Sequence, residues 1–404
     1  MKEVSGGVCA AKGYTANGVH CGLRKDMDHN DLALIYSEVP ASAAAVYTTN
    51  LVFGAPITVT RKNIADGKAQ AVICNSGNAN TCNSNGIEIA EGMCALAAGE
   101  LGIDPSDVIV ASTGVIGQKL SLDPVRAGIA GLAKGLSADG CAAAAEAIMT
   151  TDLKEKITAV QFELGGKICT IGGIAKGSGM IHPNMATMLS FITSDASISP
   201  EMLQKALSAD VEDTFNMISV DGDTSTNDMV AVMANGLAGN AEITADGGDY
   251  EFFKEALFTV MKTLAKKMAA DGEGASKLLE CRVSGAADSQ TAKIVSKSVI
   301  CSNLFKAAMF GADANWGRVL CAIGYSGANV DVAKIDVSFS SSKGDILVCE
   351  NGAGVDFSEE KALEILKEDE IKILVDLKSG DAQATAWGCD LTYDYVKING
   401  SYRS

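Results

Sequence analysis

The residues with the clearest capacity for chemistry lie between Lys176 and Thr187, in a stretch rich in glycine. Glycines beside Lys176 allow a ligand to come close to the backbone, and the lysine could bind a carboxylate. Pro183 and the small Ala186 place Thr187 on a constrained backbone, directly before the apolar, strand-like run at 188–193. That position suits a hydroxyl that attacks the carbonyl before it. An N to O acyl shift followed by hydrolysis would then release a new amino terminus.

The amine freed by such a cleavage would supply Thr187 with its own base. An α-amino group has a reference pKa of about 7.7 to 8.0, so it can take the proton of the hydroxyl without a histidine. The chain has only three histidines, His20, His29 and His182, and no G-x-S-x-G motif of a serine hydrolase. A threonine beside an apolar run is, however, most often a strand former. The residue pattern alone therefore leaves both interpretations of Thr187 open.

Two further segments are candidates for ligand binding. STGVIG at 112–117 follows an apolar run, so its backbone N–H groups could bind an anion or an oxyanion, although a strand-end glycine more often only makes a turn. DGDTSTND at 221–228 begins like a calcium loop, but Thr226 stands where that loop needs glycine and Val232 where it needs glutamate. We expect a hydrogen-bonded turn there, with a metal-dependent function as the alternative.

The cysteines do not form a recognisable site. Twelve of them are spread singly from Cys9 to Cys389, without a C-x-x-C pair or a tight cluster with histidine. This spacing signals neither a zinc site nor a redox motif. We therefore expect reduced cysteines, most of them buried, and an enzyme that needs no metal or redox cofactor.

Charge and hydropathy limit the partners of the protein. The 404 residues include 33 Lys and Arg against 50 Asp and Glu, a formal net charge of −17. This surplus repels nucleic-acid phosphates and anionic lipids, so we expect no nucleic acid and no membrane as partners. The amino terminus lacks the apolar core of a secretory signal, and no stretch approaches the roughly 18 to 20 apolar residues that span a bilayer. These features favour a cytoplasmic protein.

Strand-like and helix-like patterns alternate along the chain, which predicts a layered α/β or α+β fold. The predicted strands lie at 31–38, 57–61, 71–77 and 108–113, the predicted helices at 87–101, 123–136 and 250–271. The tail at 381–398 alternates apolar and polar residues and predicts long strands with one covered face. STGVIG would then lie at the end of the strand at 108–113, and Thr187 would lie at the start of the strand-like run at 188–193.

Six sequence blocks together resemble the glutamate N-acetyltransferase, or ornithine acetyltransferase, family of arginine biosynthesis. The blocks are NSGNAN (75–80), STGVIG (112–117), KGSGMIHPNMATML (176–189), SVDGDTSTND (219–228), DGEGASKL (271–278) and ANWGRVLCAIG (314–324). The resemblance implies a precursor cleaved between Ala186 and Thr187. Its pieces, an α chain of residues 1–186 and a β chain of 187–404, would stay associated as an α2β2 assembly. The implied fold is a layered α/β sandwich similar in plan to amino-terminal-nucleophile hydrolases.

The same resemblance implies roles for individual residues. Thr187 would be the nucleophile that takes the acetyl group of N2-acetylornithine and passes it to glutamate, while Thr113 and Gly114 would form the oxyanion hole. The implied substrate-binding residues are Thr150, Lys176, Thr187, Glu273, Asn399 and the terminal Ser404, where the family more often has threonine. Acetyl-coenzyme A would be a second acetyl donor if this member is bifunctional, and the sequence leaves that open.

Two departures from the family pattern and one rival function accompany this hypothesis. After Thr150, Thr151 and Asp152 the family usually has a proline-containing stretch, whereas LKEK follows here at 153–156. His182 precedes Pro183, where other members often carry an apolar or small residue, and we expect it to pack locally or to face solvent. The rival is an amidohydrolase or aminopeptidase that uses the same nucleophile, in which water instead of an amine attacks the acyl-enzyme.

Overall fold

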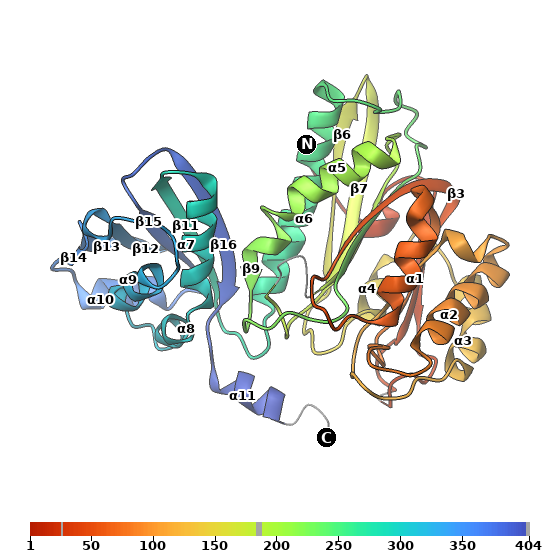
Figure 1. The fold of residues 1–404 in the computed structure, drawn as a ribbon, viewed down its shortest axis with the longest axis horizontal. Helices are drawn as coiled ribbons and strands as arrows, with labels where there is room; N and C mark the ends of the chain where they lie inside the picture. Colours follow the sequence, from red (N-terminus) through yellow and green to blue (C-terminus); the bar gives the residue numbers. More distant parts are fainter. Residues whose placement is uncertain (26, 183–187, 401–404) are drawn as a thin grey trace. The chain divides into compact units, whose positions relative to one another are not determined.

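The computed structural model describes residues 1–25, 27–182 and 188–400 (Figure 1). The chain forms two compact units. Unit 1 consists of residues 1–177, 183–216 and 223–264, and unit 2 consists of 178–182, 217–222 and 265–404. Each unit is built on its own β-sheet.

Unit 1 contains a nine-stranded mixed sheet. Its strands follow the order β1-β6-β7-β8-β10-β3-β4-β5, and β2 pairs with β3. Their bounds are Lys2–Val4 (β1), Tyr14–Val19 (β2), Leu32–Tyr47 (β3), Lys68–Asn75 (β4), Val108–Ser112 (β5), Lys156–Leu164 (β6), Lys167–Lys176 (β7), Leu189–Ser194 (β8) and Met229–Ala234 (β10). The pairs β8–β10 and β4–β5 are parallel, and the other pairs are antiparallel.

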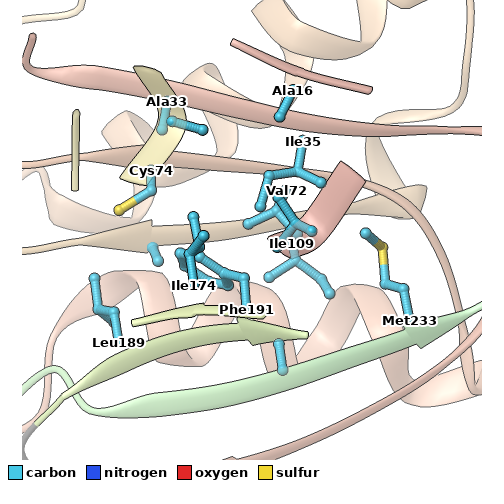
Figure 2. Packing of buried hydrophobic residues seen from close by; sticks show 14 of the residues in the cluster. Ala16, Ala33, Ile35, Val72, Cys74, Ile109, Ile174, Leu189, Phe191 and Met233 are labelled. Carbon is cyan, nitrogen blue, oxygen red and sulfur yellow. The ribbon is translucent and has the colours of Figure 1, made fainter. Parts of the chain in front are cut away.

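This sheet folds over on itself at β3. Strands β7 and β5 are five positions apart, which would separate them by about 24 Å in a flat sheet. Nevertheless Ile174 of β7 and Ile109 of β5 lie in one buried cluster, which Figure 2 shows with Val72 and Phe191. The bend lies in β3, because residues 32–36 pair with β4, residues 42–47 pair with β10, and the register with β4 shifts between Tyr36 and Ala41.

Helices cover the outer face of the β3–β4–β5 half. The helices of unit 1 are α1 (Ala55–Asn63), α2 (Gly86–Leu101), α3 (Asp123–Lys134), α4 (Cys141–Ala147), α5 (Pro200–Val211) and the first part of α6 (Gly248–Ala270). Val72 and Ile109 face the cluster shared with β7, whereas Ile73 and Val110 pack with residues of α2 and α3, which lie side by side in Figure 1. Successive strand residues point to opposite faces, so both faces are buried. The predicted layered α/β fold is confirmed.

Unit 2 is a second mixed sheet with its own helices. The strand order is β14-β13-β12-β15-β11-β16-β9. The strands are β9 (Ile218–Ser219), β11 (Leu278–Ala286), β12 (Asp336–Ser341), β13 (Gly344–Glu350), β14 (Ala353–Gly354), β15 (Glu370–Asp376) and β16 (Ala382–Cys389); the helices are α7 (Ser289–Cys301), α8 (Asn303–Phe310), α9 (Trp316–Gly324), α10 (Glu359–Leu366) and α11 (Tyr393–Gly400). Helix α7 packs on β11 and β16. Among the described residues of both units, no helix is long and apolar enough to cross a membrane.

The strand predicted at 57–61 is wrong, because these residues belong to helix α1. Pro56 lies in the first turn of α1, where the N–H that proline lacks would have no helical partner. Ile57 and Thr60 are buried three residues apart, a helical spacing. Helix α1 packs along the edge strand β5, where the Thr60 hydroxyl donates to the Val110 carbonyl at 2.8 Å, so this β-branched residue has a contact that a helix can supply.

The strand prediction for 381–398 is correct only for its first half. Strand β16 ends at Cys389, and the Asp390 carboxylate accepts hydrogen bonds from the N–H groups of Ser276 (2.8 Å) and Lys277 (2.9 Å). The chain then turns into helix α11. The alternating pattern failed here because α11 is short and its side chains are largely exposed, so no buried face selects a helical period.

Candidate active site

Two loops of unit 1 start side by side where the parallel strands β4 and β5 end. Asn75 and Ser112 are register partners at the last positions of these strands, and the Asn75 side-chain amide donates to the Ser112 hydroxyl at 2.7 Å. The Asn75 side-chain oxygen accepts from the N–H groups of Gly77 (3.2 Å) and Asn78 (3.1 Å). The blocks NSGNAN and STGVIG therefore form one structure at the carboxyl edge of the two strands, a common place for ligand sites in α/β folds.

Asn227 ties these two loops together. Its side-chain amide donates to the carbonyl oxygens of Ser112 (3.0 Å) and Ala79 (2.5 Å), and its side-chain oxygen accepts from the hydroxyls of Thr81 (2.6 Å) and Thr226 (2.5 Å). The segment 221–228 thus contributes an amide and a hydroxyl that organise the loops. Among the residues that the structure describes, no group of three or more His, Cys, Asp or Glu side chains could hold a metal ion.

Gly114 occupies a position that only glycine fits. Its φ is +123°, and an added Cβ would lie 2.9 Å from both the Asn78 nitrogen and the Gly77 carbonyl carbon. The Thr113 N–H donates to the Asn75 carbonyl at 2.9 Å, whereas the Gly114 N–H makes no hydrogen bond to another residue within the described part of the chain. The turn therefore presents an amide donor next to the Thr113 side chain, as an oxyanion site requires.

Lys176 brings three of the predicted site residues together. It is the last residue of β7 and is 8% exposed. Its ammonium donates to the hydroxyl of Thr150 at 2.8 Å and to that of Thr113 at 3.3 Å. The oxyanion candidate and two substrate-binding candidates thus form one cluster, although they are distant in sequence.

Asp152, a residue without a role implied by the sequence, holds several groups of this cluster in place. Its Oδ1 accepts from the Lys156 ammonium (2.7 Å) and the Gly177 N–H (2.6 Å), and its Oδ2 accepts from the Thr150 N–H (3.1 Å). Lys176 is a more distant ion-pair partner, with Nζ 3.9 Å from Oδ2. Burial alone would raise the pKa of Asp152, but the two ammonium groups and the hydrogen bonds outweigh it and lower that pKa to about 2.

Asp152 and its two lysine partners add one net positive charge to this cluster. Asp152 is a carboxylate at neutral pH, whereas Lys156 and Lys176 each carry an ammonium group. Lys156 is 1% exposed and sits at the start of β6, within the stretch LKEK that departs from the family pattern. An ion pair with a spare cation beside two hydroxyls is suited to bind an anionic group such as a carboxylate.

Unit 2 holds the other two substrate-binding candidates that the structure describes. The Asn399 side-chain amide donates to Glu273 Oε2 at 2.7 Å, and Glu273 is 7% exposed. The Glu273 N–H donates to the Ser178 carbonyl at 2.8 Å, and a Cβ on Gly179 would overlap the Glu273 carboxylate. Glu273 and Asn399 thus form a second polar cluster, which belongs to a different unit from the Lys176 cluster.

The segment that leads to the predicted cleavage site is held firmly within unit 2. The Asp221 carboxylate accepts from the N–H groups of Met180 (2.6 Å) and Ile181 (2.9 Å). His182 Nδ1 lies 3.1 Å from the Ser219 hydroxyl oxygen, so this histidine packs locally as expected. Ala186 and Thr187, at the predicted cleavage site, and the terminal Ser404 lie outside the described residues.

Comparisons with known proteins extend over the whole chain. The ArgJ family matches residues 15–404. The arginine biosynthesis bifunctional protein ArgJ of Caldanaerobacter subterraneus subsp. tengcongensis is 51% identical over 405 residues, and that of Symbiobacterium thermophilum is 52% identical over 406 residues; both alignments cover 100% of each chain. A crystallised chain of the arginine biosynthesis bifunctional protein ArgJ from Bacillus halodurans is 51% identical with a TM-score of 0.51. That similarity covers 54% of this chain and 100% of the crystallised one.

Proposed function

The chain belongs to the ArgJ family, and on that premise we propose that it moves the acetyl group of N2-acetylornithine to glutamate, yielding ornithine and N-acetylglutamate. The enzyme is an acyltransferase of arginine biosynthesis. The observation that carries the assignment is the Lys176 cluster, in which a nearly buried ammonium and two hydroxyls lie beside the Gly114 turn, whose N–H makes no hydrogen bond to the other described residues. Acetyl transfer between amino acids needs both features, an anchor for an α-carboxylate and a donor for an oxyanion.

The carboxylate of the substrate binds to the Lys176 ammonium. Acetylornithine and glutamate both carry an α-carboxylate, so one anchor serves both half-reactions. The hydroxyl of Thr150, which accepts from Lys176, lies within the same cluster and can donate to the same carboxylate. Glu273 and Asn399 contact the substrate as well, and a carboxylate such as Glu273 suits an ammonium group of ornithine. Ser404 is proposed as a further contact on the basis of the family pattern.

The reaction is a double displacement through an acetyl ester on Thr187. The Thr187 amine takes the proton of the Thr187 hydroxyl, and the oxygen attacks the acetyl carbonyl of N2-acetylornithine. The N–H of Gly114 and the hydroxyl of Thr113 donate to the oxyanion. When the C–N bond breaks, the proton passes to the departing nitrogen and ornithine leaves. The amine of glutamate then attacks the ester, the Thr187 amine takes its proton, and that proton returns to the Thr187 oxygen.

Cleavage between Ala186 and Thr187 supplies this amine. The resulting α chain, residues 1–186, and β chain, residues 187–404, form an α2β2 assembly. The relative from Bacillus halodurans supports two separate pieces, because its crystallised chain corresponds to only 54% of this one, the share that 218 of 404 residues represent. The relatives are called bifunctional, which supports a second activity, and we propose acetyl-coenzyme A as the second acetyl donor to glutamate.

Peptide mass spectrometry of the purified protein tests the assignment. After incubation with N2-acetylornithine alone, we expect an acetyl adduct on a peptide that begins at Thr187, and addition of glutamate should remove the adduct and release N-acetylglutamate. Thr187→Ala should give an uncleaved, inactive chain. Acetate release that is equally fast without glutamate would instead establish the rival amidohydrolase, and two fragments from Thr187→Ala would place the cleavage elsewhere.

A further inference from the structure

We propose that the buried ion pair of Asp152 and Lys156 is a charge-setting device, which keeps Lys176 available as a cation for the substrate carboxylate. This inference rests on the proposed function, because it concerns the carboxylate anchor assigned there. Asp152 and Lys156 would be positioning residues: they act through Lys176 and do not touch the substrate.

The distances show which lysine is bonded directly to Asp152. Lys156 Nζ lies 2.7 Å from Oδ1, a direct charge-assisted hydrogen bond, whereas Lys176 Nζ lies 3.9 Å from Oδ2. The hydrogen bonds of Lys176 lead instead to neutral acceptors, the hydroxyls of Thr150 (2.8 Å) and Thr113 (3.3 Å). An ammonium group has three N–H donors. Lys176 therefore keeps a donor and a net positive charge for a third, anionic partner.

Because the ion pair of Asp152 and Lys156 is buried, stabilisation of the fold alone explains its presence poorly. The side chains of Lys156 and Asp152 are 1% and 0% exposed, so both charges lost most of their hydration on folding. Buried ion pairs often stabilise a protein no more than an apolar pair of similar volume would. Asp152 nevertheless holds three groups at once. Besides the Lys156 ammonium, it accepts hydrogen bonds from the backbone N–H groups of Thr150 and Gly177, two residues next to Lys176 in the structure.

Removal of Lys156 should therefore change the charge at the anchor. Without it, Lys176 is the nearest cation left for Asp152 within the cluster, and the ammonium would be drawn from 3.9 Å into contact with Oδ2. The cluster would then be neutral. A substrate carboxylate would have to compete with Asp152 for Lys176, and its binding would weaken.

The experiment compares N2-acetylornithine with its carboxamide analogue, which lacks the negative charge, by steady-state acetyl transfer to glutamate. The wild type should prefer the carboxylate in kcat/KM. Lys156→Met should reduce this preference by about 10-fold to 100-fold, the range for a lost hydrogen bond between charged groups, mainly through KM. The double variant Asp152→Asn with Lys156→Met restores one net positive charge on Lys176, and it should recover most of the preference.

Two control variants distinguish an error in the charge-setting inference from an error in the proposed carboxylate anchor. Lys277→Met removes another buried ammonium, one that donates to the carbonyls of Met309 (2.6 Å) and Leu366 (2.7 Å) in unit 2, and it should lower the thermal midpoint while the substrate preference stays at the wild-type value. Lys176→Met should abolish the preference. If Lys176→Met keeps it, the carboxylate anchor of the proposed function is wrong. If Lys176→Met loses the preference and Lys156→Met does not, or if the double variant is no better than Lys156→Met, the charge-setting inference is overturned.

Discussion

At residue 114 the backbone itself selects the amino acid. The φ of +123° strains any residue with a side chain, and the neighbouring backbone of Gly77 and Asn78 leaves no room for a Cβ. Gly114→Ala should therefore displace the turn and its N–H. If this amide stabilises the oxyanion, kcat should fall by about 10²-fold to 10³-fold, measured as steady-state acetyl transfer on the cleaved enzyme.

Gly117 provides the matched control in the same loop. Its φ is +76°, also in the left-handed region, but a Cβ there would meet nothing within 4 Å. Gly117→Ala should cost about 1 kcal/mol of stability through backbone strain, with little effect on turnover. Equal losses of activity in the two variants would mean that general loop strain, not the position of the Gly114 amide, limits catalysis.

Some of the site residues could be assigned from the sequence, and others were found only in the structure. Thr113 and Lys176 lie in sequence blocks that resemble a known family, Thr150 was assigned through the same resemblance, and the structure brings these three together. The resemblance implied no role for Asp152 or Lys156, and their four-residue spacing runs from a loop to the first residue of β6 and not along a helix face. Their pairing depends on how β7 ends beside that loop, a tertiary arrangement that local patterns do not encode.

The same limit holds for whole elements, as helix α1 illustrates. The consecutive β-branched residues 57–60 predicted a strand, yet they form helix α1, which packs against the edge strand β5. The Thr60 hydroxyl donates to the Val110 carbonyl at 2.8 Å and accepts from the Val110 N–H at 2.9 Å. Edge strands leave such backbone groups without a ladder partner. The contact of Thr60 with the sheet therefore outweighs the preference of a β-branched residue for a strand.

Thr60→Val should be costly for this reason. Valine has nearly the same shape but no hydroxyl, so the N–H and C=O of the fully buried Val110 would lose their partner. We expect the free energy of unfolding to fall by about 1 to 3 kcal/mol, measured by urea denaturation. Thr60→Ser keeps the hydroxyl and should retain most of the stability. A Thr60→Val protein as stable as the wild type would contradict this role.

Helix α5 carries a carboxyl group that should make stability depend on pH. Burial raises the pKa of Asp210, in the last turn of α5, to about 7, and its Oδ2 has no hydrogen-bond partner in the described structure. Because the folded state binds the proton more tightly than the unfolded state, the contribution of Asp210 to stability is greatest at low pH. It decreases as pH rises from about 4 and reaches its minimum above about pH 7.

Asp210→Asn should remove this dependence. The amide cannot ionise, so the variant should gain stability over the wild type as pH rises, with an advantage about 2 to 3 kcal/mol larger at pH 8 than at pH 5. Chemical denaturation at both pH values measures the difference. An advantage that is the same at pH 5 and pH 8 would show that Asp210 does not titrate in this range.

At the scale of the whole molecule, the layered fold could be predicted, but the way the two proposed chains share a sheet could not. Most strands and helices of unit 1 follow from hydrophobic patterns, since buried strands read as apolar runs. The strand order depends on contacts between distant segments. In unit 1, strands β8 and β10 lie between β7 and β3 in the middle of the sheet, although both follow residue 187 while β7 and β3 precede it.

This interleaving predicts that the proposed cleavage between Ala186 and Thr187 would not release the pieces. β7 pairs with β8 from Ile171–Ser194 to Lys176–Leu189, and β10 pairs with β3 from Met229–Tyr47 to Ala234–Ser42, so two complete strand interfaces join the fragments. Both fragments should therefore elute together in native gel filtration and separate only in denaturant. Residues 1–186 expressed alone should be insoluble, because β7 and β3 would expose long apolar edges, and co-expression with residues 187–404 should restore solubility. A soluble, folded 1–186 fragment would mean that β8 and β10 are not required to complete this sheet.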